Sequence, residues 1–152
     1  MSKSNKGFTL IELLVVIAII GLLSTLAVVA LNSARQKSRD SKRVADIKQI
    51  QTALELYFAD ENGYPSEATA VDLGSGSQAA LCNGGFAASC SGTTYMGLVP
   101  ANPEPEDGCG ANYEYQYVST SSETYTITFC LGGSVGDLHS GAATANPNGI
   151  SQ

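Results

Sequence analysis

The sequence predicts an α+β fold in which one long N-terminal helix packs on a small antiparallel β-sheet. The stretch from Phe8 to Leu31 is uncharged apart from Glu12, and it exceeds the roughly 20 apolar residues that a helix needs to span a bilayer. Apolar residues from Val44 to Phe58 recur at spacings of three and four, which is typical of an amphipathic helix. Two runs of β-branched and aromatic residues near the C-terminus predict a β-hairpin.

The long helix is expected to run unbroken to about Asp60, because no proline interrupts this stretch. Residues 8–31 would form its membrane-spanning half. Residues 32–62 would form a polar collar followed by the amphipathic half. The collar, residues 32–43, is polar on all sides, so it is not expected to enter a core. The amphipathic stripe consists of Val44, Ile47, Ile50, Leu54, Tyr57 and Phe58, and Ala45, Ala53 and Leu56 broaden it.

The helix is expected to end at Asn62 and Gly63, with Pro65 behind them. Asn and Gly accept the left-handed conformation that follows many helices, and proline cannot continue a helix. The remaining residues, 63–152, would form a globular head.

The first part of the head, residues 66–108, is rich in Gly, Ser, Ala and Pro. This composition predicts a long irregular connection, with a short helix near residues 68–73. The tail, residues 132–152, is rich in Gly and Ala and predicts at most a short edge strand.

The C-terminal hairpin is expected from residues 113–118 and 124–131, with residues 119–123 as the turn and Val118 opposite Thr124. Aromatic residues that alternate along a strand could form a sugar-binding face. More often they pack on a helix that crosses the sheet, and we expect that role here. The residues concerned are Tyr113, Tyr115 and Tyr117.

Charge is segregated along the chain, whose formal net charge is −6. All eight Lys and Arg residues lie at or before Lys48, whereas acidic residues continue from Glu55 to Asp137. An acidic head argues against nucleic-acid binding, which requires clustered cations. The basic residues from Arg35 to Lys48 follow a membrane span, so lipid headgroups or a neighbouring chain are their expected contacts.

Four cysteines in a small, loop-rich head predict disulfides and an oxidising compartment. They lack the close pair that is typical of zinc sites. Of the three pairings, we expect Cys82–Cys90, which closes a short glycine-containing loop, and Cys109–Cys130. The second follows from the hairpin register, which would place Cys130 opposite Asn112 and near Cys109.

Catalysis has little support in the sequence. Residues 132–136 match G-x-S-x-G, and Ser134, Asp137 and His139 follow in the order of a hydrolase triad. However, a nucleophile elbow requires a following helix, which the Gly- and Ala-rich tail cannot form. The sequence therefore predicts that the protein is not an enzyme.

Metal binding is also weakly supported. Glu104, Glu106 and Asp107 form an acidic cluster in a proline-rich loop, and calcium favours such oxygens. The loop lacks the D-x-D-x-D-G pattern, so a solvated acidic surface is expected. We predict no cofactor, with calcium as the one ion left open.

The stretch Lys6-Gly7-Phe8-Thr9-Leu10-Ile11-Glu12 closely resembles the processing site of class III signal peptides. These belong to the type IV pilin family, which includes the pseudopilins of type II secretion. The shared features are a short basic leader, Gly before the cut, Phe after it and Glu at the fifth mature position. The head resembles small pilins in architecture. Many family members carry a proline where this chain has Val29.

The resemblance implies a pilin-like fold and a leader of residues 1–7. A prepilin peptidase would cut between Gly7 and Phe8, and the new Phe8 amine would be N-methylated. Subunits would wait in the cytoplasmic membrane with the N-terminus inside and the head outside. A pilus assembly platform would then build them into a helical filament, at the cell surface or in the periplasm, with residues 8–31 at its core.

The implied function is that of a structural subunit of a type IV pilus-like filament or pseudopilus. The alternative is a membrane-anchored extracytoplasmic binding domain that does not polymerise. The count of Lys and Arg beside the span would place the head in the cytoplasm. The cysteines and the leader pattern favour the opposite orientation.

Glu12 is the residue that needs a partner, because a carboxylate at membrane depth costs at least a few kcal/mol. Cleavage would create an α-amine at Phe8, one helical turn away. In a filament Glu12 could meet the Phe8 amine of an adjacent subunit. Such a pair would fix the axial register between subunits, because breaking it leaves an unpaired buried charge.

Overall fold

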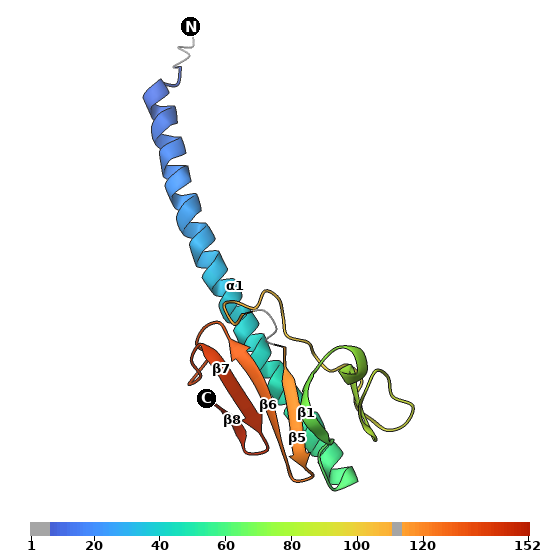
Figure 1. Cartoon of the computed structure of the whole chain (residues 1–152). Coiled ribbons are helices and arrows are strands. Elements are labelled where there is room, and N and C mark those ends of the chain that lie inside the picture. The colour runs from blue at the N-terminus through green and yellow to red at the C-terminus, as the bar shows by residue number, and fades with distance from the viewer. Residues whose placement is uncertain (1–6, 111–113) are drawn as a thin grey trace. The chain divides into compact units, whose positions relative to one another are not determined.

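The computed structural model describes residues 7–110 and 114–152 of the chain (Figure 1). It confirms the α+β architecture, with one long N-terminal helix followed by antiparallel strands. The chain divides into two compact units, Met1–Arg35 and Gln36–Gln152. The leader lysines Lys3 and Lys6, together with Asn112 and Tyr113, lie outside the described residues.

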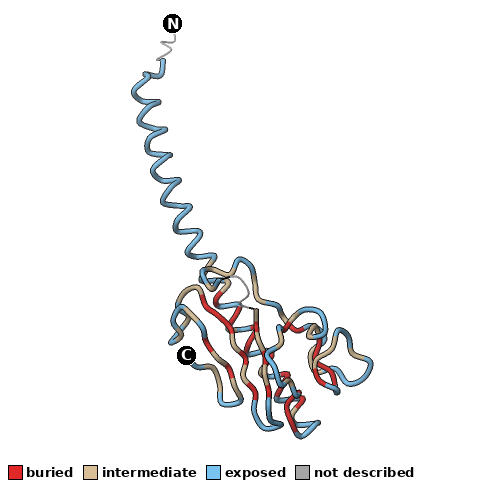
Figure 2. Tube along the Cα trace, viewed as in Figure 1, coloured by how far each residue is buried: buried red, intermediate tan, exposed pale blue. Residues whose placement is uncertain are grey.

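Helix α1 (Leu10–Glu61) contains the predicted apolar span. Its most apolar 18-residue window has a mean hydropathy of 2.9, and none of that window is buried. Figure 2 shows the first half of α1 exposed throughout. By length and composition this helix can cross a membrane.

The second half of α1 packs through the predicted stripe. Ile47, Ile50 and Leu54 are at most 1% exposed, while Val44 and Phe58 are half-buried at its margins. Leu56 and Ala45, which we expected to broaden the stripe, are instead exposed. Leu56 follows Leu54 by two residues, which places it about 200° around the helix and therefore on the opposite side.

The prediction for the collar was wrong. Asp40 and Arg43 are fully buried, and Asp46, just beyond the collar, is 6% exposed. Polar residues can enter a core when charged partners and hydrogen bonds compensate their lost hydration. The partners of Asp40 and Arg43 come from segments far along the chain and are described below.

The helix exit follows the predicted pattern. Asn62 has a φ of 54°, in the left-handed region, and its amide donates a hydrogen bond to the Phe58 carbonyl. The amide of Tyr64 then donates to Ser122 O at 2.8 Å, and the Tyr117 hydroxyl donates to Pro65 O at 2.8 Å. The exit thus ties the end of α1 to the sheet.

The larger sheet has five antiparallel strands in the order β1-β5-β6-β7-β8. The predicted hairpin forms its centre. Its strands are β1 (Glu67–Asp72), β5 (Gln116–Ser121), β6 (Thr124–Leu131), β7 (Gly141–Asn146) and β8 (Gly149–Ser151).

The predicted register of the hairpin was wrong by two residues. Val118 pairs with Thr126, and Ser121 pairs with Thr124. Strand β5 extends to Ser121, and the Ser119 hydroxyl lies 2.9 Å from both the Ser121 and the Thr124 carbonyl oxygens, so it can donate to either one across the tighter turn.

Two segments contain strands beyond those predicted, although the short edge strand allowed in the tail is present as β8. The short helix expected near residues 68–73 is strand β1, which covers the open edge of β5 through pairs such as Val71 with Tyr117. The tail supplies two strands, and β7 lies inside the sheet between β6 and β8. Its inward residues, Ala143 and Ala145, are buried despite their small size.

The segment expected to be one irregular connection contains a second, three-stranded sheet in the order β3-β2-β4. A short 3₁₀ helix, Gly76–Gln78, precedes it. The predicted disulfide Cys82–Cys90 is confirmed, with a Cα separation of 5.4 Å, and the segment that it closes contains β3. The strands are β2 (Ala80–Cys82), β3 (Gly85–Ala87) and β4 (Thr94–Met96).

Tyrosines fill much of the core between α1 and the sheet. Tyr115, Tyr117 and Tyr125 are at most 1% exposed, which confirms the packing role predicted for the first two. The Tyr125 ring stacks on Tyr117 and meets Tyr64 edge-on, with centroids 5.8 and 4.7 Å apart. Aromatic pairs at such separations add stability beyond their buried area.

Candidate functional site

The N-terminal end of α1 carries the predicted assembly residue in a defined local structure. Thr9 precedes the helix, and its amide and hydroxyl donate to Glu12 Oε2 at 2.8 and 2.5 Å. The Glu12 amide donates in return to Thr9 Oγ1 at 3.3 Å. This is a capping box, which satisfies free amides at a helix start. The T-x-x-E spacing was readable in the sequence, and our prediction missed it.

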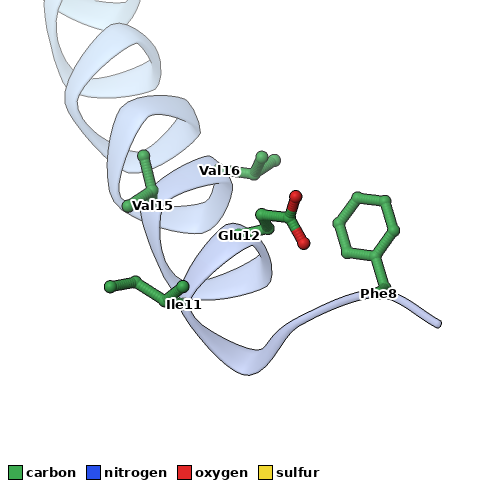
Figure 3. A pocket seen from close by; sticks show the side chains of 5 residues that line it. All are labelled: Phe8, Ile11, Glu12, Val15 and Val16. Atoms are coloured by element: carbon green, nitrogen blue, oxygen red, sulfur yellow. The ribbon is translucent and has the colours of Figure 1, made fainter. Parts of the chain in front are cut away.

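The surroundings of the Glu12 carboxylate are otherwise apolar. Phe8 and Ile11 are 79% and 69% exposed, and the carboxylate points toward the Phe8 ring (Figure 3). With Val15 and Val16 these side chains line a shallow groove of about 350 Å³. Among the described residues, Glu12 forms no ion pair, so an apolar partner that covered this groove would also bury an uncompensated charge.

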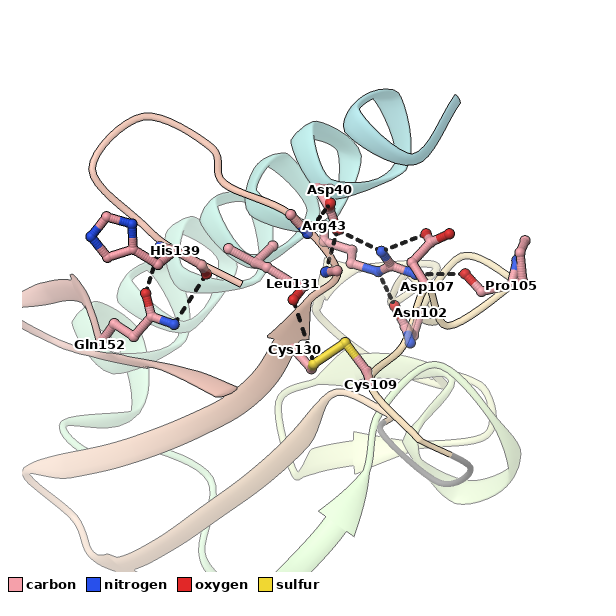
Figure 4. Close-up of a disulfide and its surroundings, with 12 residues drawn as sticks. Asp40, Arg43, Asn102, Pro105, Asp107, Cys109, Cys130, Leu131, His139 and Gln152 are labelled. Carbon is pink, nitrogen blue, oxygen red and sulfur yellow. Dashed lines mark hydrogen bonds and ion pairs between the residues drawn. A yellow bond between two sulfur atoms is a disulfide. The ribbon is translucent and has the colours of Figure 1, made fainter. Parts of the chain in front are cut away.

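A second polar site lies in the head, around the collar residue Arg43 (Figure 4). Its side chain is 0% exposed, and all five guanidinium N–H groups have acceptors, which is the full donor count of an arginine. The acceptors are Asn102 Oδ1 from Nε (2.8 Å), Asp40 Oδ1 (2.6 Å) and Asp107 Oδ2 (3.0 Å) from Nη1, and Pro103 O and Pro105 O (both 2.9 Å) from Nη2.

Asp40 connects this cluster to the segment that follows β6. Its two carboxylate oxygens accept hydrogen bonds from the amides of Gly132 and Gly133, at 3.0 and 2.8 Å. A Cβ atom at Gly132 would clash with the Cβ and carbonyl oxygen of Asp107, so only glycine fits between the two aspartates. The close approach explains why glycine follows the strand here.

Asp107 was predicted to lie on a solvated acidic surface, and that prediction was wrong. Its side chain is 7% exposed and forms ion pairs with both Arg39 and Arg43. The hydrogen bond from Arg39 is the main cause that lowers the pKa of this carboxyl below its ordinary 3.8. Glu104 stays exposed, as predicted, and Glu106 is half-buried.

The disulfide Cys109–Cys130 joins the two segments that meet at Arg43. It is confirmed, with a Cα separation of 5.9 Å. Cys109 lies two residues after Asp107, and Cys130 lies two residues before Gly132. The disulfide therefore holds together the chain segments that supply acceptors to Arg43 and donors to Asp40 (Figure 4).

The Asp107 carboxyl predicts an acid-side loss of stability. Because its native pKa lies below 3.8, the folded state binds fewer protons than the unfolded state. The stabilisation is present above about pH 3.8 and is lost as the pH falls below that value. Unfolding free energies of the full chain in detergent, measured between about pH 5 and pH 2, should show this slope.

Asp107→Asn is expected to lose that slope, whereas Glu104→Gln, in the same loop but exposed, should retain it. Asp46 acts separately. Burial raises the pKa of its carboxyl, so its contribution to stability is lost as the pH rises above 3.8, which is the opposite direction to Asp107. An unchanged acid slope in Asp107→Asn would contradict the assignment.

The residues of the rejected triad do not form a catalytic arrangement in the part of the chain that the structure describes. Ser134, Asp137 and His139 lie in the loop between β6 and β7, where Asp137 is exposed. The described hydrogen bonds of His139 use its backbone, which pairs with the Gln152 amide group. Among the described residues, no group of three or more His, Cys, Asp or Glu side chains could hold a metal ion.

Two family models match the chain. The model described as "Prokaryotic N-terminal methylation motif" matches residues 2–28. The model described as "Type II secretion system (T2SS), protein G" matches residues 30–144, which is more than half of the chain. No solved structure matches.

Several curated proteins are similar to part of the chain. Type II secretion system core protein G of Aeromonas hydrophila is 39% identical over 70 residues, which cover 46% of this chain and 49% of the relative. The protein of the same name from Pectobacterium carotovorum is 44% identical over 62 residues, covering 41% and 40%. The type IV wide pilus major component PilA4 of Thermus thermophilus is 40% identical over 73 residues, covering 47% and 56%. The matches thus span about half the length of these relatives.

Proposed function

The chain belongs to the family of type II secretion system protein G, and we propose that it is a structural subunit of a pseudopilus or type IV pilus-like filament. One observation carries the proposal. The first half of α1 exposes its apolar side chains on all sides and holds a single carboxylate, Glu12. Such an apolar surface must be shielded from water, by a membrane before assembly and by the helices of other copies afterwards.

The proposal includes processing at Gly7 and Phe8. The N-terminal methylation model covers both residues. A Cβ atom added at Gly7 would meet nothing within 4 Å, and Phe8 is 79% exposed, so a peptidase can reach the bond between them. A prepilin peptidase would cut here on the cytoplasmic side, and the Phe8 amine would then be N-methylated.

Replacing Gly7 with Leu is expected to block cleavage, leave Lys3 and Lys6 attached and stop assembly. Gly21→Leu is the matched control, because that glycine also has open space around it but lies inside the span. N-terminal sequencing of both variants from membranes tests the expectation. A wild-type chain that begins after Ala30 or Ala34 would indicate a conventional signal peptide and contradict the proposal.

Glu12 is proposed to set the register of the filament. In the free subunit the carboxylate is held by Thr9, which donates neutral hydrogen bonds and leaves the charge uncompensated. Packing among apolar helices would remove water from the carboxylate, and the Phe8 amine of a neighbouring copy would supply the opposite charge. The pair would form at one axial offset only, so it selects register more than it adds stability.

The head is proposed to lie outside the cytoplasm, with the N-terminus inside. Its two disulfides support an oxidising compartment. The filament would grow at a membrane assembly platform, and the role requires no catalysis and no nucleic-acid partner.

Polymerisation is the property to test. Cells that express the chain with its secretion machinery should release pelletable filaments on shearing, without detergent, alongside a pool of membrane monomer. A chain found only as membrane monomer, under conditions in which the machinery is active, would contradict the proposal.

A further inference from the structure

A groove of about 480 Å³ lies beside the second half of α1, where the helix meets β8 and the loop between β6 and β7. The lining is mostly apolar, and two exposed charged residues, Lys48 and Asp137, stand among it. Its apolar side chains are those of Val44, Val135, Leu138 and Ile150.

Leu56 is an unpartnered apolar side chain on the same helix. It is 56% exposed, and its neighbours Glu55, Asp60 and Glu61 are exposed as well. One exposed leucine is ordinary on a protein surface. Of the three carboxylates, Glu55 accepts a hydrogen bond from the Tyr64 hydroxyl and lines a separate groove together with Lys48 of the same chain. Asp60 follows Leu56 by one helical turn, so it is the carboxylate beside this leucine, and it remains exposed although the Tyr95 hydroxyl donates to it.

The groove and Leu56 cannot meet within one chain. Leu56 follows Lys48 by eight residues, which corresponds to about 12 Å along the helix and about 80° around it. Two complementary patches at different places on one molecule make a head-to-tail contact between copies. Such a contact repeats into an open helical assembly when it does not close into a ring.

The distribution of basic residues indicates which cation can meet the acidic head of a second copy. No basic residue follows Lys48, so α1 must supply the cations that meet a neighbouring head. Arg39 and Arg43 are already engaged with Asp107. Lys48 is exposed at the groove, and the described residues form no salt bridge with it.

We propose that a second copy of this chain inserts Leu56 into the groove, with its Asp60 against Lys48. Asp137 would repel the same carboxylate, which orients it toward Lys48 and away from the loop. The inference rests on the proposed function and deepens it, because it names the surface through which successive heads contact each other.

Charge exchange in the full chain tests the pairing. Lys48→Glu and Asp60→Lys should each lower the sheared filament yield about tenfold relative to membrane monomer, which corresponds to about 1.4 kcal/mol. The variant with both changes should recover most of the yield, because each contact again joins opposite charges. Lys37→Glu, at an exposed lysine outside the groove, is the control for the change of charge: it should lower the yield less than Lys48→Glu does, and Asp60→Lys should not recover its yield.

Leu56→Ala tests the apolar part of the contact. The side chain is exposed in the monomer, so its loss should leave the membrane monomer unchanged and reduce only the filament. Carbodiimide treatment of wild-type filaments grown from isotopically light and heavy chains should also link Lys48 of one copy to Asp60 of another.

The outcomes separate the two proposals. A wild-type chain without filaments would contradict the proposed function itself. Wild-type filaments combined with normal yields from Lys48→Glu and Leu56→Ala would overturn the docking surface alone. The docking surface would also be overturned if the variant with both Lys48→Glu and Asp60→Lys failed to recover the filament yield and no crosslink joined Lys48 of one copy to another copy.

Discussion

Glu12→Leu is expected to abolish filaments while the membrane monomer remains at its normal level. The substitution makes the span more apolar, so insertion should hold or improve. In the filament, however, the Phe8 amine of each incoming subunit would lose its partner among apolar helices. The penalty for an unpaired buried charge is several kcal/mol, and it would recur at every subunit. Sheared-filament and membrane fractions from the same cells measure the effect.

The capping box requires a control, because Glu12→Leu also removes the two hydrogen bonds that Thr9 donates to the Glu12 carboxylate. Thr9→Ala removes the two bonds of the Thr9 hydroxyl but keeps the carboxylate, at a cost of about 1 kcal/mol to the helix start. Near-normal filament yield from Thr9→Ala, with none from Glu12→Leu, assigns the effect to the charge. Equal losses from both variants would reduce Glu12 to a capping residue.

Arg43→Met is expected to destabilise the head by about 3–5 kcal/mol, because it leaves Asp40 and Asp107 without their shared buried cation. Arg43→Lys should recover little, since an ammonium group cannot reproduce five donors in a fixed plane. Urea unfolding of the full chain in detergent, followed by tyrosine fluorescence, measures both variants.

Arg35→Met is the matched control, because Arg35 is exposed. Surface substitutions of this kind usually change stability by no more than about 0.5 kcal/mol. If Arg43→Met were as stable as Arg35→Met, the buried cluster would not be what attaches residues 102–107 and the segment after β6 to α1.

Features encoded by neighbouring residues were predictable from the sequence. The apolar span, the amphipathic stripe around Ile50 and the helix stop at Asn62 each depend on patterns within a few residues. Both disulfides followed from loop length and from an approximate hairpin. An error of two residues in the register did not change this pairing: the Cα atoms of Cys109 and Cys130 lie 5.9 Å apart, within the range of a disulfide.

Features that depend on distant partners were not predictable in the same way. The pattern around Arg43 is polar on all sides, and only Asp107 and the backbone carbonyls some 60 residues later make its burial favourable. Strand β1 exists because β5 offers an open edge, which no local propensity indicates. The alanines of β7 are likewise weak strand formers whose pairing with β6 decides their structure.

We propose that this chain is cut before Phe8, modified and built into a filament as an oxidised subunit. A mass spectrum of the native protein from the sheared fraction tests all three steps at once. We expect a chain that begins at Phe8, carries one methyl group and lacks the four hydrogens that two disulfides remove. A spectrum that shows an uncut chain from Met1, or a start after Ala30 or Ala34, would contradict it.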